Sequence, residues 1–206
     1  MRLFIFARHA ESSANAAGVV NSDPSHEFGL TPRGKRQAEA LGEQLAHIRI
    51  DQAVCTRFAR TRQTIELALR GNDTPLRVEP DLDEIRAGAF DGAPIDAYWA
   101  WKERHRRSDR FPGGESPDDA ARRYASALRR LLARQELVTV IVCHESALRY
   151  VIDAAADRSS IGHSQVEIAN AAPFLFDEPA LRRAVVCLKA LASSPALEPA
   201  VADVAA

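Results

Sequence analysis

The sequence predicts an α/β fold of three layers, with helices on both faces of a mostly parallel central sheet. Apolar segments of strand length alternate along the chain with segments that repeat apolar residues at helical spacing. Two strand-like segments, 3–7 and 137–143, are almost continuously apolar or β-branched, as expected of central strands buried on both faces. A chain of 206 residues can bury roughly 70% of its unfolded surface in one domain, which we expect at 1–191, followed by a flexible tail at 192–206.

Each expected element is marked by its apolar pattern or by residues that begin helices. Strands are expected at 2–8, 51–56, 76–79, 137–143, 165–176 and 184–189, and helices at 32–48, 58–70, 94–107, 117–135 and 146–156. The helix at 32–48 has the clearest signals, because Thr31 is a favourable N-cap and Pro32 fits the first helical position. Ser116 is a candidate N-cap for the helix at 117–135.

Composition and charge argue against several functional classes. The net charge of −1 and the pI of about 6.6 give no electrostatic reason to bind nucleic acid or an acidic membrane. No apolar stretch approaches the roughly 20 residues of a membrane span, and the strand-like start lacks a signal-peptide pattern. Cys55, Cys143 and Cys187 lack CxxC spacing and each lies in an apolar, strand-like run, so we expect buried free thiols in a reducing cytoplasm.

Two of the expected central strands end in histidine. The first ends at Arg8-His9, and the strand at 137–143 is followed by His144. Open α/β sheets place their ligands at the carboxyl ends of strands, so neighbouring parallel strands would bring these two imidazoles side by side. Arginine is a fixed cation with a donor fork suited to phosphate, and neutral histidine can form a covalent phospho-intermediate. The pattern therefore favours a phosphoryl-transfer site over histidines in surface loops.

A series of short motifs extends this pattern over most of the chain, from Leu3 to about Phe176. In order they are Arg8-His9-Ala10-Glu11-Ser12 with Asn15; Leu30-Thr31-Pro32-Arg33-Gly34 with Gln37-Ala38 and Leu41-Gly42; Thr56-Arg57-Phe58-Ala59-Arg60-Thr61-Arg62-Gln63-Thr64; Leu82-Asp83-Glu84-Ile85 with Gly88; Phe90-Asp91-Gly92; Gly113-Gly114-Glu115-Ser116; Val142-Cys143-His144; and Asn170. With these motifs in this order, the chain resembles the histidine phosphatase superfamily, also called phosphoglycerate-mutase-like. The resemblance implies a phosphoglycerate mutase-like fold and a phosphohistidine intermediate.

The resemblance assigns the nucleophile and the groups around the phosphate. It makes His9 the nucleophile, and a neutral imidazole suits this role because an anion would be repelled by a phosphomonoester dianion. Catalysis of phosphoryl transfer consists mostly of positioning and charge stabilisation. The expected phosphate-binding groups are Arg8, Arg60, His144 and, through neutral hydrogen bonds, Asn15.

The leaving alkoxide needs a proton, and the attacking water needs a base. The resemblance assigns both tasks to Glu84, with Asp83 as the competing choice. Arg57 and Arg62 are expected on a solvated face. Asn170 either helps to hold one of the histidines or is a turn residue at an edge strand.

One position departs clearly from the family pattern. The family normally has Gly after its second catalytic histidine, and this chain has Glu145. A carboxylate there is unfavourable beside a phosphate unless it points away, lies at the start of the following helix or pairs with an arginine, and it would raise the pKa of a nearby histidine. The mouth of the site is expected to involve Phe28, Ile85, Tyr98, Trp99, Trp101 and the basic run 104–107, although most of these aromatic residues also fit a core.

We therefore expect a metal-independent phosphomonoester hydrolase that uses no cofactor and acts on a small-molecule phosphoester. A cofactor-dependent mutase is one alternative, but it needs an enclosing insertion, and the segment between Glu84 and Glu115 is modest for that role. A phosphate-binding homologue that has lost turnover is another, yet binding alone has no need of a general acid. Sugar phosphates, phosphoglycerate derivatives, nucleotide-loop precursors and phosphoproteins all fit as substrates, and a homodimer is one expectation for the assembly.

Overall fold

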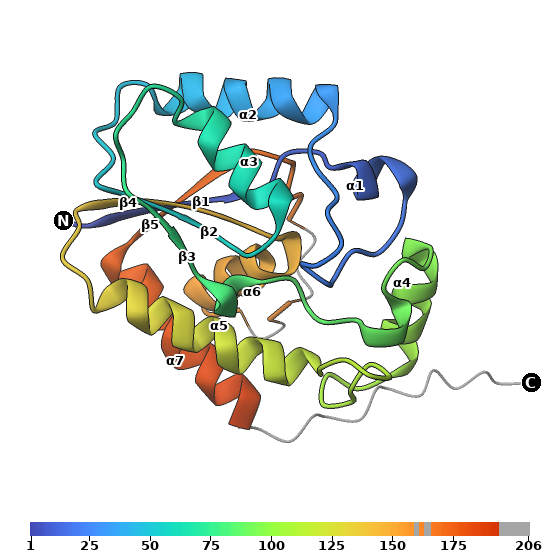
Figure 1. The fold of residues 1–206 in the computed structure, drawn as a ribbon. Coiled ribbons are helices and arrows are strands. Elements are labelled where there is room, and N and C mark those ends of the chain that lie inside the picture. Colours follow the sequence, from blue (N-terminus) through green and yellow to red (C-terminus); the bar gives the residue numbers. More distant parts are fainter. Residues whose placement is uncertain (159–160, 163–165, 194–206) are drawn as a thin grey trace, which may run out of the picture.

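The computed structural model describes residues 1–158, 161–162 and 166–193 (Figure 1). In chain order the elements are β1 (Leu3–Arg8), α1 (Ser13–Ala17), α2 (Pro32–Leu45), β2 (Gln52–Cys55), α3 (Ala59–Ala68), β3 (Leu76–Val78), η1 (Pro80–Leu82), η2 (Gly88–Phe90), α4 (Ile95–Arg104), α5 (Pro117–Leu132), β4 (Val138–Cys143), α6 (Glu145–Ala155), β5 (Pro173–Asp177) and α7 (Glu178–Ser193). Within the described residues the strands form one sheet in the order β3-β2-β4-β1-β5, in which β5 alone runs antiparallel.

The two central strands, β1 and β4, send alternate side chains to opposite faces of the sheet. Ile5 and Ala7 pack with α2 and α3, whereas Phe4 and Phe6 pack with α5, α6 and α7. Figure 1 shows these helix groups on opposite sides of the strands. The three-layer α/β/α fold with a mostly parallel sheet is confirmed.

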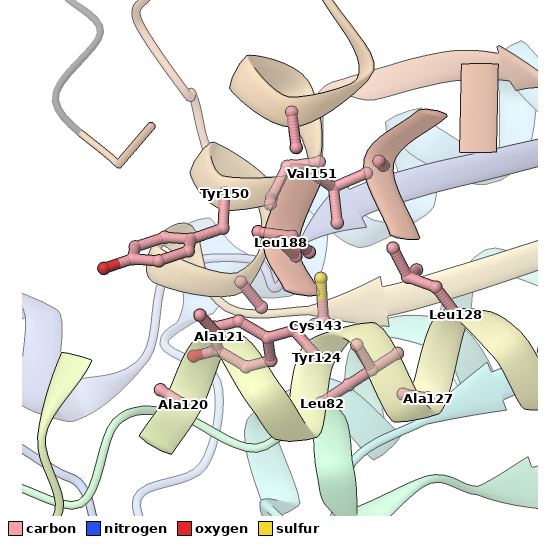
Figure 2. Packing of buried hydrophobic residues seen from close by; sticks show 14 of the residues in the cluster. Leu82, Ala120, Ala121, Tyr124, Ala127, Leu128, Cys143, Tyr150, Val151 and Leu188 are labelled. Carbon is pink, nitrogen blue, oxygen red and sulfur yellow. The ribbon is translucent and has the colours of Figure 1, made fainter. Parts of the chain in front are cut away.

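The larger core lies between the sheet and the layer of α5, α6 and α7. Figure 2 shows Tyr124 and Leu128 of α5, Val151 of α6 and Leu188 of α7 gathered around Cys143 of β4. Apart from Tyr124, these side chains are wholly apolar or weakly polar. The Tyr124 hydroxyl lies 3.1 Å from the Ser146 hydroxyl at the start of α6, so this buried ring also has a polar partner.

The two expected helix caps are confirmed. Thr31 caps α2 by accepting a hydrogen bond from Gly34 N at 2.9 Å, and Pro32 occupies the first helical position. Ser116 forms a capping box with Asp119 at the start of α5. The carboxyl ends of α2, α4 and α5 lie about three residues earlier than their apolar patterns predicted, which is the usual weakness of sequence-based helix ends.

The end of the chain differs from the prediction. Residues 184–189, expected as a strand, lie inside helix α7, and Cys187 is a half-buried helical residue. The short run Ala-Val-Val-Cys-Leu has strand-like composition, but buried residues recur at helical spacing through the element: Leu181, Ala184, Val185, Leu188 and Ala192. Packing of this face against α5 and α6 therefore outweighs the β-branched composition.

Three other boundaries are also corrected. The strand expected at 165–176 begins only at Pro173, and the loop after β1 contains the short helix α1. Of the expected flexible tail, Ala192 and Ser193 belong to α7, while 194–206 lie outside the described residues. Among the residues that the structure describes, no helix combines the length and the apolar composition needed to cross a bilayer.

The register of β1 and β4 determines where the two histidines lie. Arg8 is paired with Cys143 at the end of the two parallel strands, so His9 and His144 leave the sheet side by side. Beyond this edge lie α1 and α4 (Figure 1), and a bridge between Val19 and Pro94 joins the segment after α1 to the residue before α4.

Helix α2 packs very closely against the loop that follows His9. A Cβ atom on Gly34 would lie 2.0 Å from the backbone oxygen of Glu11, so only glycine fits at this contact. The same loop is held by Gln37, whose side-chain oxygen accepts a hydrogen bond from Glu11 N at 2.8 Å.

We predict that Gly34→Ala lowers the free energy of unfolding in urea by about 1–3 kcal/mol through overpacking, although alanine is the better helix former by about 1 kcal/mol. Arg36→Ala, at an exposed position of the same helix, is the control and should change stability by less than about 0.5 kcal/mol. A Gly34→Ala protein as stable as the control would contradict the close contact.

Candidate active site

His9 is fixed in one orientation and one tautomer. Its backbone N donates to Cys143 O at 2.9 Å, and its backbone O accepts from Asn170 Nδ2 at 2.7 Å. The ring lies 2.8 Å from Ala10 O through Nδ1, which must therefore carry the proton. The lone pair of Nε2 is left to accept a hydrogen bond, and it accepts one from Arg60 Nε at 2.9 Å.

Arg60, in the first turn of α3, lies between the two histidines. Besides His9, its guanidinium reaches His144 Nδ1 at 3.1 Å, the backbone O of Asn21 at 3.0 Å and the side-chain oxygen of Asn21. Its Cζ lies 4.3 Å from the centre of the Phe58 ring. The planar fork of one arginine thus organises both imidazoles.

His144, which follows β4, is completely buried. Because Nδ1 accepts from Arg60, Nε2 carries the proton and donates to Thr56 Oγ1 at 2.9 Å. The His9 and His144 ring centres are 5.4 Å apart, so the structure brings the two imidazoles together as their strand positions predicted. Both ring nitrogens of His144 already have partners. The ring therefore contacts Arg60 from the side away from the cavity, which Arg60 lines.

Burial and neighbouring cations keep the two imidazoles neutral. Burial, followed by the charges of Arg60 and Arg8, holds the pKa of His9 well below 6.5. Burial and then the charge of Arg60 likewise hold the pKa of His144 well below its usual value. Burial lowers the pKa of Arg60 to about 10, so this side chain stays cationic at neutral pH. The site is a cationic pocket with an unprotonated imidazole nitrogen at its floor.

Glu84 lies on the loop after η1 and lines the same pocket. Its Oε1 accepts hydrogen bonds from the Ser146 hydroxyl and from Ile85 N, the latter at 2.9 Å. Asp83, the competing candidate, is held by Arg57, whose Nε lies 2.6 Å from Asp83 Oδ2. Arg57 is therefore an ion-pair partner of the loop, not only a solvated residue.

The loop that carries Glu84 is anchored by Arg123, a half-buried residue of α5. Arg123 donates to the backbone oxygens of Asp81, Asp83 and Glu84 at 3.1, 2.7 and 2.9 Å. Its charge is balanced by Glu115, whose Oε1 lies 2.6 Å from Arg123 Nη2. Glu115 belongs to the Gly113-Gly114-Glu115-Ser116 motif, whereas Arg123 lies in no motif of the sequence, yet together they fix the position of the acid/base candidate.

Glu145, the unusual residue after His144, pairs with two arginines. Its Oε2 lies 2.8 Å from Arg8 Nη1, and its Oε1 lies 2.8 Å from Arg149 Nη2. It also occupies the first turn of α6, where a negative charge is favourable. Arg8 additionally donates to Ile168 O at 3.1 Å. The sequence allowed three favourable arrangements for the Glu145 carboxylate. Two of them occur: it pairs with arginine, and it lies at the start of a helix.

Two asparagines line the cavity, and the sequence revealed only one of them. Asn15 lines the pocket, and its Oδ1 accepts from Ser12 N at 3.1 Å in the cap of α1. Asn21, which anchors Arg60, was missed. The loop of Asn21 is held by Asp91, which accepts from the Ser22 hydroxyl at 2.9 Å across 69 residues of sequence, and such a distant contact leaves no local signal.

A cavity of about 130 Å³ opens in front of His9. One water needs roughly 10–15 Å³ of such volume, so the cavity has room for a phosphoryl group and part of a leaving group. Its lining includes Arg8, His9, Asn15, Asn21, Arg60, Glu84, Ile85, Ile95, Tyr98, Trp99, Lys102, Glu145, Ser146 and Arg149. Trp101, by contrast, packs against Phe111 in the core, with ring centres 4.1 Å apart.

Among the described residues, no three His, Cys, Asp or Glu side chains form a group that could hold a metal ion.

Comparison with known protein families shows which family has this arrangement of motifs. The model of the histidine phosphatase superfamily (branch 1) matches residues 4–179. The chain belongs to this superfamily. It is 33% identical over 116 residues to the adenosylcobalamin/alpha-ribazole phosphatase of Salmonella typhi. The aligned region covers 56% of this chain and 50% of that protein. It is 32% identical over 172 residues to 6-phosphofructo-2-kinase/fructose-2,6-bisphosphatase 4 of Homo sapiens. The aligned region covers 76% of this chain and 34% of that protein.

The chain therefore spans half the length, or less, of these two curated relatives. Among solved structures, the alpha-ribazole phosphatase from Shigella flexneri superposes with a TM-score of 0.74 at 24% identity, covering 85% of this chain and 90% of that one. The Bacillus stearothermophilus protein YhfR superposes with a TM-score of 0.76 at 21% identity, covering 86% and 91%. These superpositions show a shared fold.

The lowered pKa of His9 predicts a dependence of stability on pH. The unfolded chain binds a proton near pH 6.5 that the folded chain does not, so stability is lost as pH falls below that value. Between pH 7.5 and 5.5, each such histidine should contribute a loss of about 1.4 kcal/mol. In urea unfolding, His9→Gln should therefore lose about 1.4 kcal/mol less over this range than the unsubstituted protein.

His47→Gln, at an exposed position, is the matched control and should keep the original dependence. Equal pH dependence in the two variants would mean that His9 titrates normally in the folded protein.

Proposed function

We propose that this protein is a metal-independent phosphomonoester hydrolase that uses His9 as its nucleophile and a small-molecule phosphoester as its substrate. The observation that carries the proposal is the state of His9: a neutral ring whose proton is fixed on Nδ1 and whose Nε2 lone pair points into a pocket of arginines. A nucleophile for a dianionic phosphoryl group needs these properties. Family membership and the phosphatase names of two curated relatives support it.

In the first step, Nε2 of His9 attacks phosphorus and the bond from phosphorus to the leaving oxygen breaks. Glu84 in its acid form gives its proton to that oxygen. Phosphoryl oxygens replace His9 as partners of Arg60 Nε, which releases the lone pair for attack. Arg8 and Arg60 stabilise the charge of the transferring group, while His144 orients Arg60 from behind.

In the second step, water attacks the phosphorus of phosphohistidine. The carboxylate of Glu84 takes a proton from this water, the bond between nitrogen and phosphorus breaks, and inorganic phosphate leaves. One carboxyl group thus serves as acid and then as base. Ser146, hydrogen-bonded to both Glu84 and Tyr124, is suited to hold the carboxyl group in place through both steps.

A mutase would retain the phosphorylated enzyme and return the phosphoryl group to a second position on the product. The matched relative from Erwinia tasmaniensis, 28% identical over 70% of each chain, is described as a probable phosphoglycerate mutase. The pocket is covered by one short helix, α4, between Glu84 and Glu115. Such a cover favours release of the product and access of water, which supports hydrolysis.

The test is phosphate release from 4-nitrophenyl phosphate in the presence of a chelator. His9→Ala should lower kcat by about 10³-fold or more, and His47→Ala, at an exposed histidine, should leave it unchanged. Rapid quenching with a radioactive phosphoester should trap an acid-labile phosphoenzyme that the His9→Ala variant lacks. Strict dependence on a divalent cation would contradict the proposal, and isomerisation of phosphoglycerates without net phosphate release would favour the mutase.

The pairing of Glu145 with Arg8 gives a separate prediction. Glu145→Gln removes a negative charge beside the phosphate site and frees Arg8 for the ligand, so inorganic phosphate should inhibit about fivefold more tightly. Glu66→Gln, on the exposed face of α3, is the matched control and should leave the inhibition constant unchanged. Weaker inhibition in Glu145→Gln would show instead that the carboxylate is needed to hold Arg8 in place.

A further inference from the structure

A lysine lines the cavity in addition to the arginines. Lys102 projects from α4 into the cavity lining, and its Nζ lies 4.9 Å from the centre of the Trp99 ring and 5.7 Å from that of Tyr98. The chain has three lysines among its 27 lysines and arginines, and the other two, Lys35 and Lys189, are exposed on α2 and α7.

Lys102 has no carboxylate partner among the described residues, since none lies within 4.0 Å of its Nζ. The two carboxyl groups of the cavity are already engaged: Glu84 with Ser146, and Glu145 with Arg8 and Arg149. Burial lowers the pKa of Lys102, while the charge of Glu84 opposes this shift. A partly desolvated ammonium held mainly by aromatic rings is a favourable site for an anion from the ligand.

The charges of the cavity leave room for such an anion. Its cations are Arg8, Arg60, Lys102 and Arg149, and its carboxyl groups are Glu84 and Glu145. In the first step of the proposed reaction, in which Glu84 is the acid, the four cations exceed the one remaining carboxylate by three charges, one more than a phosphoryl dianion neutralises. A second negative charge on the substrate would complete the balance.

The wall next to Lys102 is apolar and open at the mouth of the cavity. Ile95 and Trp99 of α4 line it, with exposed fractions of 37% and 45%, and the buried Ile85 lines the same cavity. Large apolar side chains left open beside a catalytic cavity are suited to contact a ligand. The leaving group therefore needs an apolar or ring-shaped body as well as a charge.

We infer that the substrates of this site are phosphomonoesters whose leaving group carries a second anionic group, bound by Lys102, on a body that packs against Trp99 and Ile95. The inference rests on the proposed hydrolase activity and adds the class of leaving group to it. The anion is a carboxylate or a second phosphate, two sources of the same charge.

The test compares kcat/KM for phenyl phosphate, 4-carboxyphenyl phosphate and 1,4-phenylene bisphosphate. The unsubstituted protein should prefer at least one of the two anionic esters over phenyl phosphate by about tenfold or more, and the preferred ester identifies the anion. Lys102→Met should reduce this preference to about one, whereas Lys102→Arg and the exposed control Lys35→Met should retain it. Intrinsic reactivity is the same for every variant, so a change in the ratio reports Lys102.

Lys102→Gln is a second variant without charge, in case the methionine variant fails to fold. Hydrolysis of all three esters with the same ratio in the Lys102 variants and the unsubstituted protein would overturn the inference and leave the proposed activity intact. If the protein hydrolyses none of the three esters and no member of a wider panel of phosphoesters, the proposed activity itself is overturned.

Discussion

The site depends on one interaction: the guanidinium of Arg60 between two neutral imidazoles. It donates to Nε2 of His9 and to Nδ1 of His144, and these bonds fix the proton of each ring on the opposite nitrogen. A protonated imidazole could not accept from an arginine, so the arrangement exists only while both rings are uncharged. Burial and the positive charge of Arg60 enforce that state. The same contacts therefore prepare the pocket proposed for the phosphoryl group, with the proposed nucleophile at its floor.

The scaffold supports this interaction through contacts that are far apart in the sequence. The parallel register of β1 and β4 places the two histidines side by side. The loop held by Asp91 supplies Asn21, which anchors Arg60 from the other side. Arg123 and its partner Glu115 fix the loop of Glu84 through backbone oxygens. The proposed nucleophile, phosphate ligands and acid/base residue thus come from separate segments that meet at one edge of the sheet.

The sequence predicted the parts of this arrangement that leave local signals. Two continuous apolar runs ending in histidine predicted the central strands and their adjacency, and the caps Thr31 and Ser116 predicted two helix starts. Helix α7 was missed because a short β-branched run has the composition of a strand, and its buried face is recognisable only against α5 and α6. Asn21 was equally hidden, and for Glu145 the sequence offered pairing with an arginine only as one of three arrangements, because the partners of both residues are set by the tertiary fold.

The most direct measurement of the central interaction is ¹⁵N NMR of the histidine rings as a function of pH, with signals assigned through His9→Gln and His144→Gln. We expect both rings to stay neutral between pH 7.5 and 5.5, with the proton on Nδ1 of His9 and on Nε2 of His144. Inorganic phosphate should shift the Nε2 signal of His9, because the anion competes for Arg60. Titration of either ring near pH 6.5, or the opposite tautomer at His9, would contradict the account.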